Sequence, residues 1–272
     1  MNLKFLGTAL AVLAIAGSSA FAHISYSNRN FGTLIISADV SNTTQTVSSG
    51  FGWADATDVD WGDSHRGRFF RFNLANPLAG DQGVRITVSR NLLGTGANHT
   101  FLPAFSLFSG LAQLTPEALA HDSSTLSVNS RPAGTEGSFR SLADWSIGND
   151  DTYNTAGDPA SGILIAARLA NFAYIGHAAD GTSTNFGNAA GIIGDGQADG
   201  FITATFSGLS AGDFSLFVGG ANYELQATET GPTYPTYGIN VTVGLVPEPS
   251  ASSLLLIAAI SGWLRKRKES RS

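Results

Sequence analysis

The sequence predicts an all-β protein, an antiparallel β-sandwich or jelly roll with long loops rich in glycine and aspartate. Three observations lead to this fold class. Short runs in which apolar and polar residues alternate recur along the chain, which is the pattern of half-buried strands. Clusters of Gly, Asn, Asp and Ser separate these runs and are typical of turns. Finally, 32 glycines and only 13% charged residues disfavour helices.

The elements follow from these patterns in chain order. The predicted strands cover residues 33–40, 68–74, 84–88, 101–108, 202–206, 214–218 and 239–243. Residues 163–175 fit either a helix or a pair of strands, and residues 116–120 fit one short helix. Residues 123–161 are polar and rich in glycine, so we expect a large insertion or loop there.

The first 22 residues predict a signal peptide, with a signal helix in its apolar part. Lys4 precedes an apolar run at residues 5–16 that is too short to span a bilayer comfortably. Small side chains at Ala20 and Ala22 suit signal peptidase, so cleavage is expected before His23. An uncleaved N-terminal anchor is the alternative, and it would favour a longer apolar core.

The last residues, 246–272, predict a tail that is separate from the domain at residues 23–245. Pro247, Glu248 and Pro249 precede an apolar segment at residues 251–264, which predicts a single transmembrane helix of about 21 Å. This is short of a hydrocarbon core of about 30 Å, so a segment that is recognised and released is favoured over a permanent stem. A basic cluster follows and should stay in the cytoplasm. The cluster is Arg265, Lys266, Arg267 and Lys268.

The order Pro-Glu-Pro, short apolar helix, basic cluster and chain end resembles the PEP-CTERM sorting signal of Gram-negative bacteria. The resemblance covers only the end of the chain, from Pro247 to Ser272. It implies processing by an exosortase, transient anchoring in the inner membrane, and a final place at the cell surface or in the matrix of an exopolysaccharide biofilm. An ordinary single-span tail with a stop-transfer cluster is the alternative.

The domain has an acidic composition. Between residues 23 and 245 it has nine arginines, no lysine and 19 acidic residues, a net charge of −10. This composition argues against nucleic acid as a partner, because phosphate contacts need basic side chains. The chain has no cysteine, so it must be held together without disulfides and offers no thiol for catalysis or zinc binding.

Several short segments of the domain resemble the bacterial pre-peptidase C-terminal domain, a β-sandwich of secreted proteins. The segments are residues 70–72, 84–88, 104–108, 149–151 and 209–216. The resemblance implies a non-catalytic accessory module and supports the sandwich.

Calcium is the cofactor that the acidic residues suggest. Asp195 and Asp199 stand four residues apart among glycines that allow the tight turns of calcium loops, and they are our candidate metal ligands. Two further groups of acids resemble them. These groups are Asp55, Asp58, Asp60 and Asp63, and Asn149 with Asp150 and Asp151. None matches the EF-hand spacing, and aspartate and glycine are also the commonest turn residues, so plain turns remain the alternative.

Copper is a second metal that the sequence suggests. Cleavage before His23 would place an amine and an imidazole on one residue, as in the histidine brace of lytic polysaccharide monooxygenases and some copper carriers. A brace needs a second histidine, and the sequence does not choose among the four others. These are His65, His99, His121 and His177.

No other pattern in the sequence points to an enzyme. Residues 208–212 match G-x-S-x-G, but the nucleophile elbow needs a helix after Ser210, and here a strand is predicted. The numerous aromatic residues could stack on sugars, although most are expected in the core. The sequence therefore predicts an exported, non-enzymatic surface or matrix protein, structural, adhesive or glycan-binding, with signal peptidase, exosortase and extracellular polysaccharide as partners. A copper protein and a ligand-free accessory module are the alternatives.

Overall fold

The structure is a computed structural model, and it describes residues 24–36, 38–54, 61–112, 123–124, 138–148, 170–187, 191–229 and 234–247. Within these ranges no helix is both long and apolar enough to cross a bilayer. The predicted signal peptide at residues 1–22, the tail helix at residues 251–264 and the short helix at residues 116–120 lie outside the described residues.

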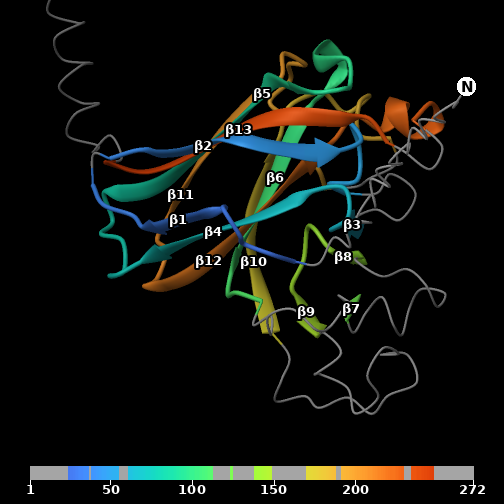
Figure 1. The fold of residues 1–272 in the computed structure, drawn as a ribbon. Coiled ribbons are helices and arrows are strands. Elements are labelled where there is room, and N and C mark those ends of the chain that lie inside the picture. The colour runs from blue at the N-terminus through green and yellow to red at the C-terminus, as the bar shows by residue number, and fades with distance from the viewer. Residues whose placement is uncertain are drawn as a thin grey trace, which may run out of the picture.

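The described chain is all-β and forms two main sheets that face each other (Figure 1). One has seven strands in the order β1-β4-β12-β6-β10-β9-β7 and the other has four in the order β11-β5-β13-β2, while β3 and β8 form a small third sheet. The strands of the first are β1 (Asn30–Thr33), β4 (Arg68–Leu74), β12 (Gly212–Gly220), β6 (Pro103–Ser109), β10 (Ala170–Ala179), β9 (Trp145–Gly148) and β7 (Ser123–Ser124). Those of the others are β11 (Phe201–Ser207), β5 (Gln82–Gly94), β13 (Thr236–Pro247), β2 (Val40–Ser48), β3 (Trp61–Asp63) and β8 (Ser138–Arg140). Two 3-10 turns, η1 (Asn98–Thr100) and η4 (Tyr223–Ala227), complete the described elements.

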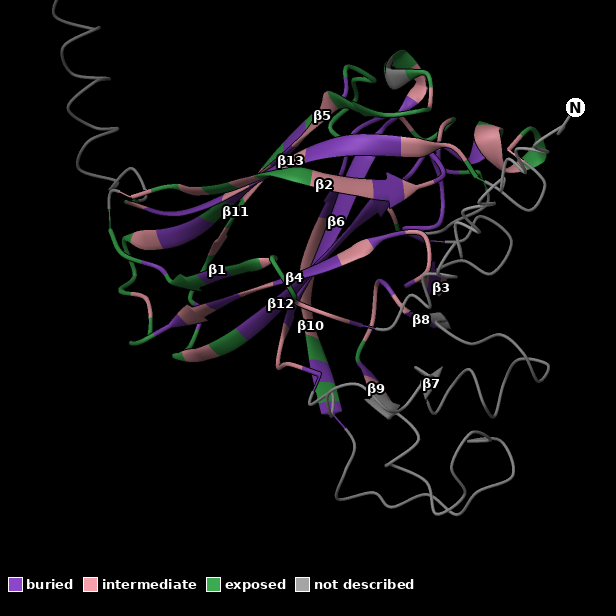
Figure 2. Ribbon diagram, viewed as in Figure 1, coloured by how far each residue is buried: buried purple, intermediate pink, exposed green. Residues whose placement is uncertain are grey.

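The main hydrophobic core lies between the two large sheets (Figure 2). Alternate residues of each strand point into it, such as Phe70 and Phe72 of β4 and Val84, Ile86 and Val88 of β5. All five are at most 1% exposed. Two apolar inner faces packed in this way are what a β-sandwich requires.

A second core, rich in aromatic rings, covers the other face of the seven-stranded sheet. Phe69 and Phe217 alternate with the residues of the first core, so they point to the opposite side of β4 and β12. There they pack with Phe139, Trp145 and Phe172, and the rings of Trp145 and Phe172 stack at 4.2 Å. The seven-stranded sheet is therefore buried on both faces, which its alternating pattern does not reveal.

Most of the predicted strands are confirmed, and three regions differ from the prediction. The predicted strand at residues 33–40 is wrong, because residues 34–39 form the connection between β1 and β2. Strand β2 was missed because it is a polar edge strand in which only Val47 is fully buried. The ambiguous segment at residues 163–175 contributes to strand β10 from Ala170 onward. The predicted loop at residues 123–161 contains three short strands, β7, β8 and β9.

The pairing is antiparallel throughout the main sheets except between β1 and β4, which are parallel.

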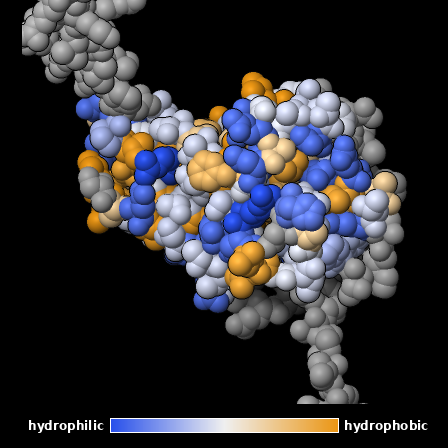
Figure 3. Space-filling model, turned by 90° about the horizontal axis from the view of Figure 1, so that it is seen from above, coloured by the Kyte–Doolittle hydropathy of each residue, from blue (hydrophilic) through white to orange (hydrophobic). Residues whose placement is uncertain are grey.

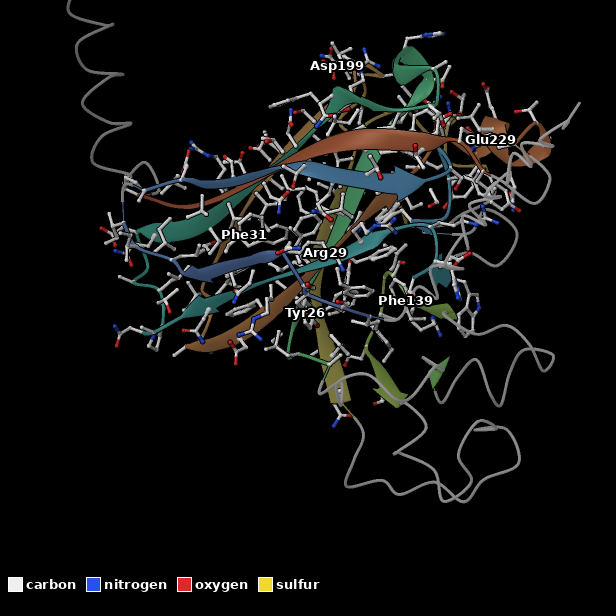
Figure 4. All side chains as sticks on the ribbon, viewed as in Figure 1. Tyr26, Arg29, Phe31, Phe139, Asp199 and Glu229 are labelled. Atoms are coloured by element: carbon white, nitrogen blue, oxygen red, sulfur yellow. The ribbon has the colours of Figure 1, made fainter. Side chains whose placement is uncertain are left out.

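The segment before β1 is held tightly to the seven-stranded sheet. Ile24 is 1% exposed, and the hydroxyls of Tyr26 and Ser215 lie 2.7 Å apart. The Arg29 guanidinium donates to the carbonyls of Ser25 and Phe69 and to the Gln45 side chain, which joins β1 to the edge of the four-stranded sheet (Figure 4).

The connections gather at the two ends of the sheets. We call one end the tail pole; it holds residues 34–39, 75–81 and 208–211 and the end of β13. The other end, the aspartate pole, holds residues 180–187 and 191–200, which belong to the connection from β10 to β11. Gln82 of β5 pairs with Pro247 at the tail pole and Ser89 pairs with Phe201 beside the aspartate pole. At about 3.3 Å per residue, these two positions on β5 are about 23 Å apart.

Candidate metal site

Three aspartates meet at the aspartate pole. Asp180 directly follows β10, while Asp195 and Asp199 lie in the connection that leads into β11. Their carboxylate oxygens lie within 4.8 Å of one another, and they are the one group of three or more metal-ligating side chains among the described residues. Figure 4 shows Asp199 at the upper end of the molecule, beyond the strands. The structure thus brings together the two predicted ligands and adds a third that the sequence reasoning missed.

The backbone around the three aspartates is fixed by the sheet. Ala179 forms a parallel bridge with Gly194, and the Asp195 N–H donates to the Ala179 carbonyl at 3.1 Å. The Gly196 N–H donates to the carbonyl of Gly181 at 3.1 Å. Asp195 is therefore held beside the end of β10, although it lies far along the connection from Asp180 in the sequence.

The carboxylate of Asp180 is buried, and both of its oxygens accept backbone hydrogen bonds. The N–H of Gly200 donates at 2.6 Å and the N–H of Asp199 at 3.1 Å. The pKa of Asp180 is raised to about 6, mainly by burial and also by the negative charges of Asp195 and Asp199, while the two backbone hydrogen bonds act in the opposite direction. Two hydrogen bonds thus fix the position of the carboxylate, but its ionised form is disfavoured relative to the protonated form.

The other two carboxylates are exposed and shape their own turns. One oxygen of Asp195 accepts from the Gln197 N–H at 3.0 Å, and one of Asp199 accepts from the Phe201 N–H at 3.1 Å. The second oxygen of each side chain accepts no hydrogen bond from the described residues.

Gly200 has a φ of +81°, and a Cβ there would collide with the Arg90 side chain, so any other residue at this position would be strained.

The other acidic groups do not form such a cluster in the described residues. Asp55, Asp58, Asp60 and residues 149–151 lie outside the described ranges. Asp63 is described, and its oxygens accept from Nε of Arg66 at 3.0 Å and from the N–H of His65 at 2.9 Å. Burial alone would raise the pKa of Asp63, but its hydrogen bond to His65 and the charges of His65 and Arg66 outweigh burial and lower it. Asp63 therefore stabilises its own turn through its contacts with His65 and Arg66.

The histidines are spread over the molecule. His23 and His121 lie outside the described residues, and His99 is exposed in η1. Nε2 of His177 accepts from the N–H of Ile193 at 3.2 Å, which assigns the ring proton to Nδ1, next to the Tyr174 hydroxyl. Burial lowers the pKa of His177 and raises that of Tyr174 to about 12, so burial favours the neutral form of each group. With both nitrogens occupied, His177 is a structural side chain.

The remaining candidates have structural roles where they are described. Strand β12 begins at Gly212, directly after the turn that contains Ser210, so the helix required by a nucleophile elbow is replaced by a strand, as predicted. Most of the described aromatic rings are buried, including Trp53, Trp145 and Tyr223. Tyr234 is 37% exposed, and the centre of its ring lies 4.0 Å from the Arg66 guanidinium.

Figure 3, a view from above, shows a surface of mainly hydrophilic and neutral residues with separate hydrophobic patches. The outer face of the four-stranded sheet carries polar side chains. A row of hydroxyls crosses it, with Ser41 and Thr242 paired at 2.8 Å and Thr87 and Thr203 paired at 3.0 Å. These hydroxyls form hydrogen bonds with one another across the strands, and such cross-strand pairs stabilise the sheet.

Of the predicted sorting and cleavage residues, the structure describes only Pro247. It is the last residue of β13, so the sheet extends two residues beyond the predicted domain limit at residue 245. The six other sorting residues lie outside the described ranges, as do Ala20 and Ala22 of the cleavage site.

No family model matches the chain, and no curated protein matches it. Two solved structures are similar to it. One is CorA, a surface-associated copper-binding protein of Methylomicrobium album BG8; it is 14% identical, with a TM-score of 0.47 over 79% of this chain and 98% of that chain. The other is MopE, a secreted protein of Methylococcus capsulatus in which an oxidized tryptophan facilitates copper binding; it is 15% identical, with a TM-score of 0.40 over 80% of this chain and 87% of that chain. At TM-scores below 0.5, neither likeness bears on what this chain binds.

Proposed function

We propose that this chain is an exported, non-enzymatic surface or matrix protein that binds Ca²⁺ through Asp180, Asp195 and Asp199. The observation that carries the calcium proposal is the meeting of three carboxylates within 4.8 Å. Calcium binds oxygens at about 2.4 Å, so two ligands of one ion lie at most about 4.8 Å apart. The spacing fits one shared cation.

The charges around the site support a divalent ion. Three carboxylates repel one another, and the nearby negative charges raise the pKa of Asp180. A bound cation would reverse this effect, since it favours the ionised form of each ligand. The two exposed carboxylates leave the outer side of the ion open to water or to a ligand such as the hydroxyl or carboxylate oxygens of a polysaccharide.

Export and sorting complete the proposal. The signal peptide and the PEP-CTERM tail are expectations from the sequence, and they would place the domain outside the inner membrane. In a polysaccharide matrix with millimolar calcium, a site of modest affinity would be filled. An adhesive role follows, in which the ion links the protein to acidic glycan chains.

A calcium titration of residues 23–250, the predicted domain without the apolar segment of the tail, tests the site. At ten times the dissociation constant, binding to the folded state alone adds about 1.4 kcal/mol, which raises Tm by about 3–6 °C for a domain of this size. Asp199→Asn should abolish the shift. Asp81→Asn, which removes an exposed aspartate from the tail pole, should leave it intact. An unchanged Tm in millimolar calcium would mean that the three aspartates serve only their turns.

Copper binding at the cleaved N-terminus is the competing function. Ile24 is buried and Arg29 is bonded to its surroundings, so the described chain is anchored from its first residue. A brace would then form at a defined place on the domain. Stoichiometric copper bound by the mature chain and lost in His23→Ala would establish it, and His177→Gln should have no effect on copper binding.

A further inference from the structure

Strand β13 leads directly into the sorting motif. Val246 pairs with Gly83 and Pro247 with Gln82, so the first proline of the motif is the last residue of a strand in the four-stranded sheet. Leu245, two residues earlier, is only 8% exposed and belongs to the main core. The motif therefore follows the folded domain without a linker.

The short distance to the apolar segment restricts how the domain can sit on a membrane. Four residues along the chain lead from Pro247 to Ala251, where the apolar segment begins. Even fully extended, they span at most about 14 Å. If the segment enters a bilayer, the tail pole must therefore lie at its surface.

The tail pole exposes two large apolar side chains beside this exit point. Ile35 is 63% exposed and Ile36 is 58% exposed, and Ile36 forms a parallel bridge with Leu245 of β13. Single exposed isoleucines are ordinary on protein surfaces. These two are adjacent, and they lie next to the strand from which the apolar segment departs.

Few charges surround the two isoleucines, and the exposed acids of the tail pole include Asp81 and Asp213. Asp39, the nearest acid in the same connection, is paired with Arg85 at 2.8 Å. The 75–81 connection, which lies at the same pole, has Asp81 as its one charged residue. The large carboxylate cluster lies at the other pole, about 23 Å away along β5.

We propose that the tail pole is a membrane-facing surface, and that Ile35 and Ile36 enter the interfacial layer of the bilayer while the tail is inserted. This inference rests on the membrane insertion of the tail that we propose above. Two apolar side chains add a shallow second contact to the single helix. That contact would limit rotation of the domain, keep Pro247 at the membrane surface, where a membrane enzyme can reach it, and point the three aspartates outward.

The lack of cysteine allows a direct test with the full chain. Ile35→Cys and Ile36→Cys each introduce a single thiol, which is labelled with an environment-sensitive fluorophore before reconstitution into vesicles that contain spin-labelled lipid. The matched control is Leu92→Cys; Leu92 is 92% exposed and lies ten residues from Gln82 along β5, or about 33 Å. Unchanged Tm values of the three variants would show that each is folded.

We expect blue-shifted emission and several-fold stronger lipid quenching for labels at positions 35 and 36 than for the label at position 92. Equal quenching at all three positions in a chain that floats with the vesicles would overturn the inference and leave the anchoring proposal standing. A chain that does not float with the vesicles would overturn both.

Discussion

The tail pole and the aspartate pole are built by the same strands, yet they differ in chemistry. The tail pole has few charges, two exposed isoleucines and a strand that runs into the sorting motif. The aspartate pole has three carboxylates, one of them buried, on a connection held by a bridge to β10. Antiparallel strands explain the separation, because successive connections alternate between the two ends of the sheets. A sandwich can therefore place an attachment site and a ligand site at opposite ends without a second domain.

The largest effect is expected at the tail pole. Replacement of Pro247, Glu248 and Pro249 by alanines should change the compartment of the protein completely, because the apolar segment remains while the proposed recognition site is lost. Pro247 is exposed at the end of β13, so the fold should survive the change. Cell fractionation with a blot should show an uncleaved, membrane-bound precursor.

Pro77→Ala is the matched control for this experiment, since Pro77 is another exposed proline of the tail pole. It should leave processing unchanged. If both variants release a shortened domain to the same extent, the Pro-Glu-Pro motif is not required for processing.

At the aspartate pole we expect an effect of pH on the free energy of unfolding. The pKa of Asp180 is about 6 in the fold, above its ordinary value of 3.8. Without metal, this group therefore contributes most stability below about pH 4, and that contribution is lost as the pH rises through about 6. By linkage the loss is about 3 kcal/mol.

Urea unfolding at pH 4 and pH 7 measures this loss as the difference between wild type and Asp180→Asn, which cannot ionise at this position. Groups that do not interact with Asp180 cancel in that difference. Calcium at pH 7 should recover stability in the wild type only. Identical pH profiles for the two proteins would mean that the pKa of Asp180 is not raised in the fold.

The smallest effect is expected for the ion pair of the tail pole. Asp39→Asn removes the charge that pairs with Arg85, and the side chains of Arg85 and Asp39 are 44% and 45% exposed. Exposed pairs are worth about 0–1 kcal/mol, and salt screens them. Urea unfolding in low and high salt should show a small difference that disappears in high salt. If Asp39→Asn lowers the free energy of unfolding by several kcal/mol, electrostatic interactions are stronger at the tail pole than we infer.

Elements with local sequence signals could be predicted without the structure. Alternation of apolar and polar residues identified β5, β11, β12 and β13, because one side of each strand faces the main core. Spacing among glycines singled out Asp195 and Asp199, and the order of motifs from Pro247 to Ser272 led to the sorting-tail hypothesis. Each of these signals is contained within a short stretch of chain.

Features that depend on pairing between distant segments could not be predicted from the sequence. Asp180 lies beside the other two aspartates because the bridge between Ala179 and Gly194 folds the connection back onto β10. The one signal for Asp180 in the sequence is the Asp180-Gly181 pair after the strand, which is typical of a turn. The polar strand β2 exists because β13 pairs with it, and Pro247 belongs to the sheet because Gln82 lies opposite. The physical reason is the same in each case. Backbone hydrogen bonds between strands are indifferent to side-chain polarity, so strand partners and the side chains they bring together are chosen by the packing of the whole sandwich.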